Sequence, residues 1–321
     1  MDETKTELLS IVVPAYNEEE VLQEFHQRLT AVLSGIQMNP EIIYVNDGSN
    51  DKTFEVMSKL RDMDSRVAIL DLSRNFGKEI ALSAGLQKAN GDAVVIIDAD
   101  LQHPPELIQE FIKEWKNGYD VVYGKRIDRS DETVLKKVTS YIFYRFIQQM
   151  AKVKIPENSG DFRLLSRRAV NAINSLQESH RFMKGLFAWI GYPQKAIVYK
   201  VEPRKAGKTK WSYWGLWNLA IEGITSFSTI PLRISTVIGI ITALGSFLYG
   251  LYLIMITLIY GNPVPGYPSL IVLILFLGGV QLVSIGVMGE YLGRVFNETK
   301  QRPLYFVNNY LPSRQEGDEL K

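Results

Sequence analysis

Ala93-Val-Val-Ile-Ile-Asp-Ala-Asp100 joins five apolar residues to two carboxylates that are separated by a single alanine. Because Val and Ile dominate the apolar run, it predicts a strand that is buried on both faces. The two carboxylates then follow the carboxyl end of that strand. Ligands of open parallel sheets bind outside this end of the strands, so Asp98 and Asp100 are candidate site residues.

Short apolar runs alternate with amphipathic segments on both sides of this stretch. The apolar runs predict strands at Leu8–Pro14, Glu41–Val45, Val67–Leu72, Ala93–Ile97 and Asp120–Tyr123. The amphipathic segments predict helices at Glu18–Leu33, Thr53–Met63, Gly77–Ala89 and Pro105–Lys116. Strict alternation of strand and helix predicts an α/β fold with a doubly wound, mostly parallel sheet.

The pattern is less regular between residues 131 and 200. We expect a long helix at Glu132–Met150, a short strand at Phe162–Leu165 and another strand at Ile197–Val201. Ser166 is a favourable N-cap for a helix that ends at Ser175.

Composition excludes several classes of function. The chain has 321 residues, a net charge of +1 and no cysteine. Disulfides, zinc–thiolate sites and thiol nucleophiles are therefore excluded, and the charge balance gives no reason to expect nucleic-acid binding. The polar N-terminus, Met1–Glu7, lacks the apolar core of a secretory signal, which favours a cytoplasmic first half.

Two long segments without charge predict membrane spans. Ile234–Tyr260 would reach about 40 Å as a helix, enough to cross a bilayer core of about 30 Å. Ser269–Gly289 can cross it again after a connector rich in proline and glycine. The alternative, a buried soluble hairpin, is disfavoured because neither segment has a polar face. Arg233 precedes the first span and further basic residues follow the second, which places both ends and the catalytic region on the cytoplasmic side.

A basic and aromatic region precedes the first span. Trp211, Trp214 and Trp217 predict that Ser212–Phe227 lies along the membrane interface as an amphipathic helix. The alternative is a helix packed beneath the soluble domain. Just upstream, four cations can meet anionic headgroups and a lipid phosphate, although a solvated linker would have the same composition. These cations are Arg204, Lys205, Lys208 and Lys210.

Asp98 and Asp100 have the chemistry of a metal site. Hard divalent cations prefer oxygen ligands, and a cation held here would neutralise charge on a departing diphosphate. Gln102 and His103 follow closely and could complete the ligand set, although a single histidine is more often structural. Two aspartates at this spacing also arise by chance or as helix caps.

Acidic residues follow two other predicted strands. Asp47 comes directly after the strand ending at Val45, and Tyr16 and Glu18 follow the first strand. Carboxylates at these strand ends can accept hydrogen bonds from a nucleobase or ribose, and Tyr16 can flank the base. The alternative for Asp47 is a simple turn with Gly48.

Five motifs in this order make a specific combination, and the resemblance that they carry extends over almost the whole chain. They are Pro14-Ala-Tyr-Asn-Glu18, Val45-Asn-Asp-Gly-Ser49, Arg74-Asn-Phe-Gly-Lys78, Asp98-Ala-Asp-Leu-Gln-His-Pro-Pro105 and Ser159-Gly-Asp-Phe-Arg-Leu-Leu165. The combination resembles the family 2 glycosyltransferases of the polyprenyl-phosphate branch, which includes dolichol-phosphate mannose synthase. It resembles in particular the bactoprenol glucosyltransferases with two C-terminal transmembrane helices.

The resemblance implies a GT-A-like catalytic domain with defined roles for its residues. Nucleotide binding would fall to Pro14, Tyr16, Glu18, Asp47 and Asp98. A Mg²⁺ or Mn²⁺ ion would be held by Asp98, Asp100 and Gln102. The acceptor phosphate would meet Arg126, Lys137, Arg204, Lys208 and Lys210.

Asp161 occupies the position of the family's catalytic aspartate, beside Arg163. A phosphate monoester has a second pKa near ~6, so the acceptor is already largely a dianion at neutral pH. Asp161, Asp100 and Arg163 are the candidate catalytic residues, but Asp161 is as well suited to orienting Arg163 or a sugar hydroxyl as to accepting a proton. A plain Asp161–Arg163 ion pair is the alternative.

The resemblance implies transfer of glucose from UDP-glucose to undecaprenyl phosphate with inversion, in the plasma membrane and by a homotetramer. GDP-mannose, UDP-aminoarabinose derivatives or a catalytically silent scaffold are the alternatives, whereas a processive polysaccharide synthase would carry a Gln-x-x-Arg-Trp motif that is absent here. The expected organisation is a catalytic domain at 1–203, a basic juxtamembrane region at 204–232, a transmembrane hairpin at 233–293 and a cytoplasmic tail at 294–321.

Overall fold

The computed structural model describes residues 7–126, 159–179, 181–200, 229–260 and 266–314. The helix expected at Glu132–Met150 and the interfacial segment Ser212–Phe227 lie outside the described residues. Four of the expected acceptor-phosphate residues also lie outside them, namely Lys137, Arg204, Lys208 and Lys210.

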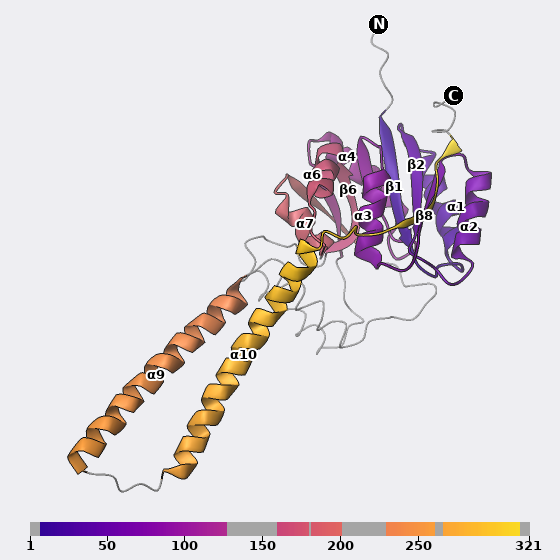
Figure 1. Cartoon of the computed structure of the whole chain (residues 1–321). Helices are drawn as coiled ribbons and strands as arrows, with labels where there is room; N and C mark the ends of the chain where they lie inside the picture. Colours follow the sequence, from indigo (N-terminus) through magenta and orange to yellow (C-terminus); the bar gives the residue numbers. More distant parts are fainter. Residues whose placement is uncertain (1–6, 127–158, 180, 201–228, 261–265, 315–321) are drawn as a thin grey trace.

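One mixed sheet organises the catalytic domain (Figure 1). Its strands are β1 (Leu8–Ala15), β2 (Asn39–Asn46), β3 (Val67–Leu72), β4 (Ala93–Ile96), β5 (Val121–Arg126), β6 (Ser159–Ser166), β7 (Gln194–Tyr199) and β8 (Val307–Leu311). Their order across the sheet is β7-β5-β6-β4-β1-β2-β3-β8. The pairs β1–β2, β1–β4, β2–β3 and β5–β7 are parallel, whereas β6 and β8 run antiparallel to their neighbours. The predicted α/β class with a mostly parallel sheet is confirmed.

Helices cover both faces of the sheet, as the doubly wound pattern predicts. They are α1 (Leu22–Leu33), α2 (Thr53–Met63), α3 (Lys78–Lys88), the short 3-10 helix η1 (Pro105–Leu107), α4 (Ile108–Lys116), α6 (Arg167–Ser175) and α7 (Met183–Trp189). α1, α2 and α4 pack on one face, and α3, α6 and α7 pack on the other. α7 is a helix that the sequence pattern does not predict.

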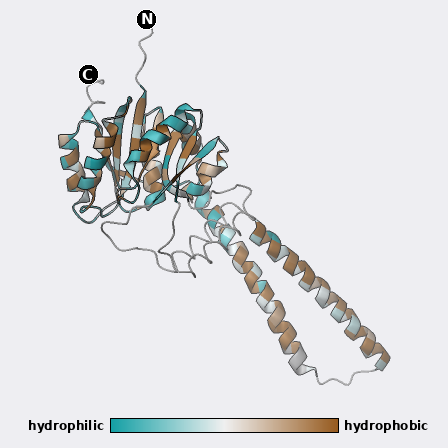
Figure 2. Ribbon diagram, turned by 180° about the vertical axis from the view of Figure 1, so that it is seen from behind, coloured by the Kyte–Doolittle hydropathy of each residue, from teal (hydrophilic) through white to brown (hydrophobic). Residues whose placement is uncertain are grey.

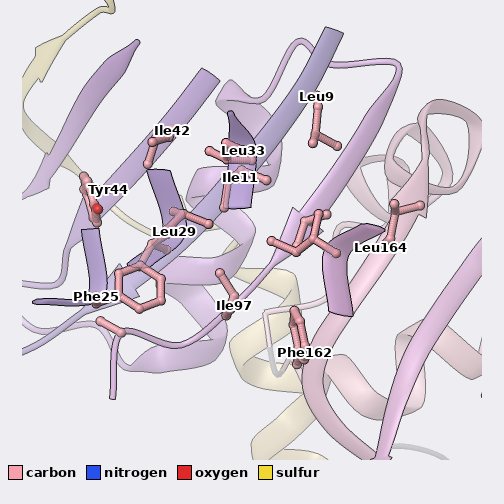
Figure 3. Close-up of a cluster of buried hydrophobic side chains, with 14 of the residues drawn as sticks. Leu9, Ile11, Phe25, Leu29, Leu33, Ile42, Tyr44, Ile97, Phe162 and Leu164 are labelled. Carbon is pink, nitrogen blue, oxygen red and sulfur yellow. The ribbon is translucent and has the colours of Figure 1, made fainter. Parts of the chain in front are cut away.

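Neighbouring residues of the central strand supply two separate hydrophobic cores. Leu9 and Ile11 of β1 pack with Phe25 of α1 and Phe162 of β6 on one face (Figure 3). Val12, the next residue after Ile11, belongs to the core on the opposite face. Because both faces are buried, the strand has no polar alternation, which explains its continuous apolar sequence.

Pairing lengthens the strands of one half of the sheet beyond their apolar runs. β5 continues past Tyr123 to Arg126, and β6 begins at Ser159 instead of Phe162, because Lys125 and Ser159 are partners in the antiparallel ladder. β7 begins at Gln194, before the predicted Ile197, since its parallel partner β5 sets the register. Asp161, which the sequence pattern places just before a strand, therefore lies within β6.

The C-terminal segment, expected as a tail at 294–321, contains the end of α10 and the strand β8. β8 adds an antiparallel edge strand to β3, with Leu70 opposite Tyr310. The Arg61 guanidinium donates two hydrogen bonds to the carbonyl oxygen of Pro312, at 3.1 and 2.9 Å, and fastens the end of the segment. The sequence of β8 is short, contains two asparagines and pairs on one side only, so it lacks the apolar signature of a buried strand.

Two long helices extend away from the catalytic domain. α9 (Ile230–Tyr260) and α10 (Tyr267–Thr299) run side by side as a hairpin (Figure 1). Both are hydrophobic around their circumference (Figure 2), and the most apolar window of each has no buried residue. Leu258 is 81% exposed. An apolar helix that no protein covers is suited to a lipid environment rather than to a soluble core.

Candidate functional site

The register between β4 and β6 brings two acidic segments together. Ile96 of β4 lies opposite Arg163 of β6 in the antiparallel ladder. Because the strands are antiparallel, this register places Asp98, two residues after Ile96, opposite Asp161, two residues before Arg163. The carboxyl ends of β1, β2 and β3 lie along the same edge of the sheet, because these strands are parallel to β4. Asp98 and Asp161, distant in sequence, therefore form one acidic pair at this edge.

Lys78, the first residue of α3, bridges this pair. Its Nζ lies 2.7 Å from Oδ1 and Oδ2 of Asp98 and 2.7 Å from Oδ2 of Asp161. The Lys78 side chain is 44% exposed, whereas those of Asp98 and Asp161 are 18% and 12% exposed. Asp161 Oδ1 is buried and has no hydrogen-bond partner among the described residues. The cluster thus retains one free acceptor and a cation that solvent can reach.

Burial and charge act in opposite directions on these groups. Burial alone would raise the pKa of both carboxyls, but the Lys78 ammonium outweighs it and holds the pKa of Asp98 and of Asp161 below the usual range. Burial would lower the pKa of Lys78, but Asp161 and Asp98 outweigh it and raise the pKa. All three groups are therefore charged at neutral pH. A carboxylate with so low a pKa is a poor proton acceptor.

His103 and Tyr199 are buried residues that support this cluster from the interior of the domain. The side chain of His103 is 1% exposed, and its Nε2 lies 3.7 Å from Oδ2 of Asp98. Its Nδ1 lies 2.6 Å from the Tyr199 hydroxyl, and its ring packs against Phe162. The structure thus gives His103 a supporting position behind Asp98. Arg126 completes the group, because its terminal nitrogen lies 3.5 Å from His103 Nε2.

Arg163 does not pair with the carboxylate of Asp161. Its guanidinium donates to the carbonyl oxygens of Gly160 at 2.8 Å and of Asp161 at 3.4 Å, and it stacks 3.7 Å from the ring centre of Phe187. Burial lowers the pKa of Arg163 to about 10, against the opposing effect of Asp161. The plain Asp161–Arg163 ion pair considered above is not formed. Arg163 instead shapes the backbone that carries Asp161.

Asp47 has a different environment from the other strand-end carboxylates. Its Oδ1 accepts a hydrogen bond from the backbone N–H of Phe76 at 2.7 Å, and its Oδ2 accepts one from Gly77 at 2.9 Å. Asp47 is 3% exposed. Burial raises its pKa, while these two N–H groups and Arg74 pull it back towards the usual range. Asp47 thus fixes the loop that leads directly to Lys78.

The loops after β1 and β2 are tied together by local hydrogen bonds. The backbone N–H of Asn17 donates to Ser49 Oγ at 3.0 Å, and that of Glu18 donates to Thr53 Oγ1 at 2.8 Å. Asn50 Nδ2 lies 3.5 Å from the Tyr16 hydroxyl. Pro14 is buried at the end of β1, while Tyr16 and Glu18 are partly exposed. The residues expected to hold a nucleotide therefore share one rigid corner of the same sheet edge.

Gly48 lets the loops after β2 and β3 touch. Its φ is +63°, and a Cβ atom there would overlap the backbone of Arg74 and Asn75. Only glycine combines this backbone conformation with such close approach. The nucleotide-side loop and the loop that carries Lys78 are consequently one packed unit.

The chemistry of the donor set around Asp98 fits a hard divalent cation. Asp98, Asp100 and Gln102 offer carboxylate and amide oxygens, and the backbone N–H of Gln102 donates to Asp100 Oδ1 at 3.1 Å to hold the turn. Among the described residues, no group of three or more acidic or histidine side chains could hold a metal ion unaided. Substrate oxygens or water would have to complete the ligand set.

Several of these features were missed at the level of sequence. The sequence pattern assigns no role to Lys78, although this residue lies within one of the motifs, and it does not distinguish Tyr199. The signal for Lys78 was its position, since it follows a glycine at the start of a helix that begins after β3. Nothing local in the sequence pairs Tyr199 with His103, because the two residues are 96 positions apart and meet only in the folded domain.

Comparison with known proteins finds one matching family model and several similar chains. The family model described as "Glycosyl transferase family 2" matches residues 10–173, which include most of β1, all of β2 to β6 and most of α6. An uncharacterized glycosyltransferase from Synechocystis sp. is 54% identical over 309 residues, covering 95% of this chain and 97% of that protein.

Two further relatives have more specific names. A bactoprenol glucosyl transferase from Shigella phage SfV is 49% identical over 301 residues, covering 94% of this chain and 98% of that protein. A prophage bactoprenol glucosyl transferase homolog from Escherichia coli is 48% identical over 299 residues, covering 93% and 98% of the two chains. The similarity therefore extends through the two apolar helices as well as the sheet.

Proposed function

We propose, from the premise that this chain belongs to glycosyl transferase family 2, that it transfers glucose from UDP-glucose to a polyprenyl phosphate. The names of the bactoprenol glucosyl transferases similar to it over nearly their whole length support the glucosyl group and the lipid acceptor. The observation that carries the proposal is the charged cluster at the β4–β6 junction. There, Lys78 joins Asp98 and Asp161 at the edge of the sheet where ligands bind.

The nucleotide is proposed to lie over the corner made by the loops after β1 and β2. Tyr16 and Glu18 are partly exposed there, and Pro14 closes the strand beneath them. Asp47 would act at this site mainly by fixing the adjacent loop, since both of its oxygens already accept backbone N–H groups. The diphosphate would then extend towards Asp98, where Lys78 supplies a positive charge.

A divalent cation, Mg²⁺ or Mn²⁺, is proposed to bind at Asp98, Asp100 and Gln102. When bound, it would neutralise negative charge on the diphosphate and so make the nucleotide a better leaving group. Lys78 competes for the same carboxylate of Asp98, so we expect its ammonium to move towards the diphosphate oxygens when the donor binds.

Transfer is proposed to occur as a single displacement. An oxygen of the acceptor phosphate forms the new bond to the anomeric carbon, while the bond from that carbon to the UDP oxygen breaks and its electron pair leaves with UDP. The acceptor is largely a dianion at neutral pH, so no proton needs to be removed. Asp161, held ionised by Lys78, therefore acts as an orienting group rather than as a base.

Arg126 is proposed to bind the acceptor phosphate. Its Nε is buried and has no hydrogen-bond partner among the described residues, so it is a donor available for an anion. Arginine recognises phosphate through several N–H groups at once. Lys137, Arg204, Lys208 and Lys210 are proposed to add positive charge from segments outside the described residues.

The hairpin of α9 and α10 is proposed to anchor the catalytic domain to the inner face of the plasma membrane. Both helices are long and apolar enough to cross a bilayer, and no part of the described chain covers them. The basic residues that flank the two spans favour a cytoplasmic position for both chain ends. We also propose assembly as a homo-oligomer, a tetramer by its resemblance to relatives.

The proposal can be tested with the full-length chain in proteoliposomes that contain undecaprenyl phosphate. UDP-glucose, GDP-mannose and a UDP-aminoarabinose derivative are offered in separate reactions, and the lipid product is identified by mass spectrometry. We expect a glucosyl phospholipid from UDP-glucose alone. A product from another donor would correct the sugar, and no lipid product from any donor would favour the scaffold alternative.

The metal requirement is tested in the same reactions. EDTA should abolish transfer, and excess Mg²⁺ or Mn²⁺ should restore it. Undiminished transfer in EDTA after extensive dialysis would refute a metal site at Asp98, Asp100 and Gln102 while leaving the glucosyl transfer intact.

A further inference from the structure

A cavity of about 290 Å³ lies between the loop after β3 and the segment that follows α10. In Figure 1 the end of α10 meets the catalytic domain close to α3. Arg74, Phe76 and Ile80 line the cavity from the catalytic domain. Lys300, Arg302 and Leu304 line it from the segment after α10. Residues far apart in sequence thus build one amphiphilic pocket.

The charge in this cavity is entirely positive. Arg74, Lys300 and Arg302 belong to its lining, which contains no carboxylate. Among the described residues, none of these three cations lies within ion-pair distance of an acidic group. The nearby carboxylate of Glu298 is engaged elsewhere, because it accepts hydrogen bonds from the backbone N–H and the hydroxyl of Ser179 at 2.9–3.1 Å.

Aromatic rings hold two of these cations without neutralising them. The Arg74 guanidinium carbon lies 4.0 Å from the ring centre of Phe76, and Lys300 Nζ lies 3.8 Å from that of Phe296. Such contacts stabilise a cation only weakly at exposed sites. Three like charges around one small cavity repel one another, so an anion bound between them would be favoured.

The position of the cavity suits a phosphate at the membrane surface. α10 has 33 residues, which corresponds to about 50 Å. A bilayer with its headgroups is about 40–45 Å thick, so the last turn of a spanning α10 reaches the outer edge of the headgroup layer. Lys300 and Arg302 directly follow that turn. This step rests on the proposed membrane span, whereas the charge of the cavity does not.

We propose that this cavity binds a phosphate group, supplied by an anionic lipid headgroup or by free phosphate, at a site separate from that of the acceptor phosphate. Arg74 and Arg302 present guanidinium groups that match phosphate oxygens, and Lys300 adds a third donor. Phe76, Ile80 and Leu304 provide an apolar wall for the carbon atoms next to a lipid phosphate.

A ligand here would contact the loop that organises the donor site. Asp47 accepts hydrogen bonds from the backbone N–H groups of Phe76 and Gly77. The next residue is Lys78, which bridges Asp98 and Asp161. The cavity thus lies against the loop whose backbone Asp47 holds in place.

The test uses acetylation of Lys300, measured by mass spectrometry on the full-length chain in nanodiscs. Three samples are compared: phosphatidylcholine alone, phosphatidylcholine with phosphatidylglycerol, and phosphatidylcholine with added inorganic phosphate. We expect Lys300 to be acetylated several-fold more slowly in a sample that supplies the bound phosphate group than in phosphatidylcholine alone. Protection by phosphatidylglycerol alone identifies a lipid headgroup as the source, whereas protection by inorganic phosphate identifies a free anion. Equal acetylation in all three samples would overturn the proposal.

A double variant separates a bound anion from a general surface effect. Arg74→Gln with Arg302→Gln keeps Lys300 but removes two donors, and should abolish its protection. Arg302→Gln alone, which leaves the loop after β3 untouched, should weaken the protection if the double variant does not fold. Lys113, exposed on α4, is the internal control and should react equally throughout. Protection that persists in a folded double variant would contradict the proposal, and neither outcome depends on sugar transfer.

Discussion

Two acidic regions at the same edge of the sheet have opposite surroundings. In the loop after β2, both oxygens of Asp47 accept hydrogen bonds from backbone N–H groups, and the residue is buried. At the β4–β6 junction, Asp98 and Asp161 are held by the partly exposed ammonium of Lys78, and one oxygen of Asp161 has no partner among the described residues. A backbone amide cannot be exchanged for substrate, whereas a lysine side chain can move. The first region therefore builds the site, and the second is free to act on a ligand.

The largest effect is expected from removing the charge that joins the second region. Lys78→Met leaves the carboxylates of Asp98 and Asp161 facing each other without a cation between them. Loss of one preorganised charged donor costs on the order of 100-fold in rate. We expect kcat/KM for sugar transfer to fall by about that factor, while Lys78→Arg retains a substantial part. Equal activity of Lys78→Met and wild type would show that the bridge has no catalytic role.

Asp47→Asn is expected to act on stability and donor binding instead. An asparagine has only one acceptor oxygen, so the N–H group of either Phe76 or Gly77 loses its partner. An unsatisfied buried donor costs about 1–3 kcal/mol, and the loop that carries Lys78 loosens. Thermal unfolding and the KM for the donor should both change. Asp62→Asn, an exposed site paired with Arg314, is the control and should leave both unchanged.

A pair of glycine substitutions compares the packing of the two regions. Gly48→Ala would force a Cβ into the backbone of Arg74 and Asn75 at a φ of +63°. A Cβ at Gly160, at the β4–β6 junction, would meet His103 at an ordinary 3.4 Å. We expect Gly48→Ala to destabilise the protein by about 1–3 kcal/mol and Gly160→Ala to cost much less. Similar melting temperatures for the two variants would contradict the expectation that a Cβ atom is tolerated less well at Gly48 than at Gly160.

The smallest effect is expected from His26, remote from both regions. Burial lowers its pKa, as does Arg66, against the opposing effect of Asp64. Between this lowered pKa and the unfolded value of 6.5, the unfolded chain binds a proton that the folded chain does not. Stability should therefore fall as the pH drops through this window. His26→Gln should flatten the dependence, measured by thermal unfolding at a series of pH values, and an unchanged slope would assign it to other groups.

The comparison also shows which parts of the site follow from sequence. The continuous apolar runs of β2 and β4 predict buried parallel strands, and their ends place Asp47 and Asp98 at one edge. The partnership of Asp98 with Asp161 depends on the antiparallel register of β4 and β6, to which no local pattern points. The bridge by Lys78 requires α3 to begin beside that junction, and this depends on how the loops after β2 and β3 pack together at Gly48.

The edge strand β8 is another feature to which no local sequence pattern points. Its asparagines resemble those of a loop, and it becomes a strand because β3 presents unpaired backbone groups at the edge of the sheet. Asn308 also donates a hydrogen bond to Asp71 Oδ2 at 2.7 Å, a contact between distant parts of the chain. The two apolar helices, in contrast, are predictable because each contains a long run without charged residues, Ile234–Tyr260 and Ser269–Gly289.

The most direct test of the site at the β4–β6 junction is the transfer of radiolabelled glucose from UDP-glucose to undecaprenyl phosphate by full-length Asp161→Asn in proteoliposomes. Wild type should form the labelled lipid, whereas the variant, with an unfolding temperature close to that of wild type, should form it at least about 100-fold more slowly. Equal rates of product formation by the folded variant and wild type would contradict the assignment of sugar transfer to this junction.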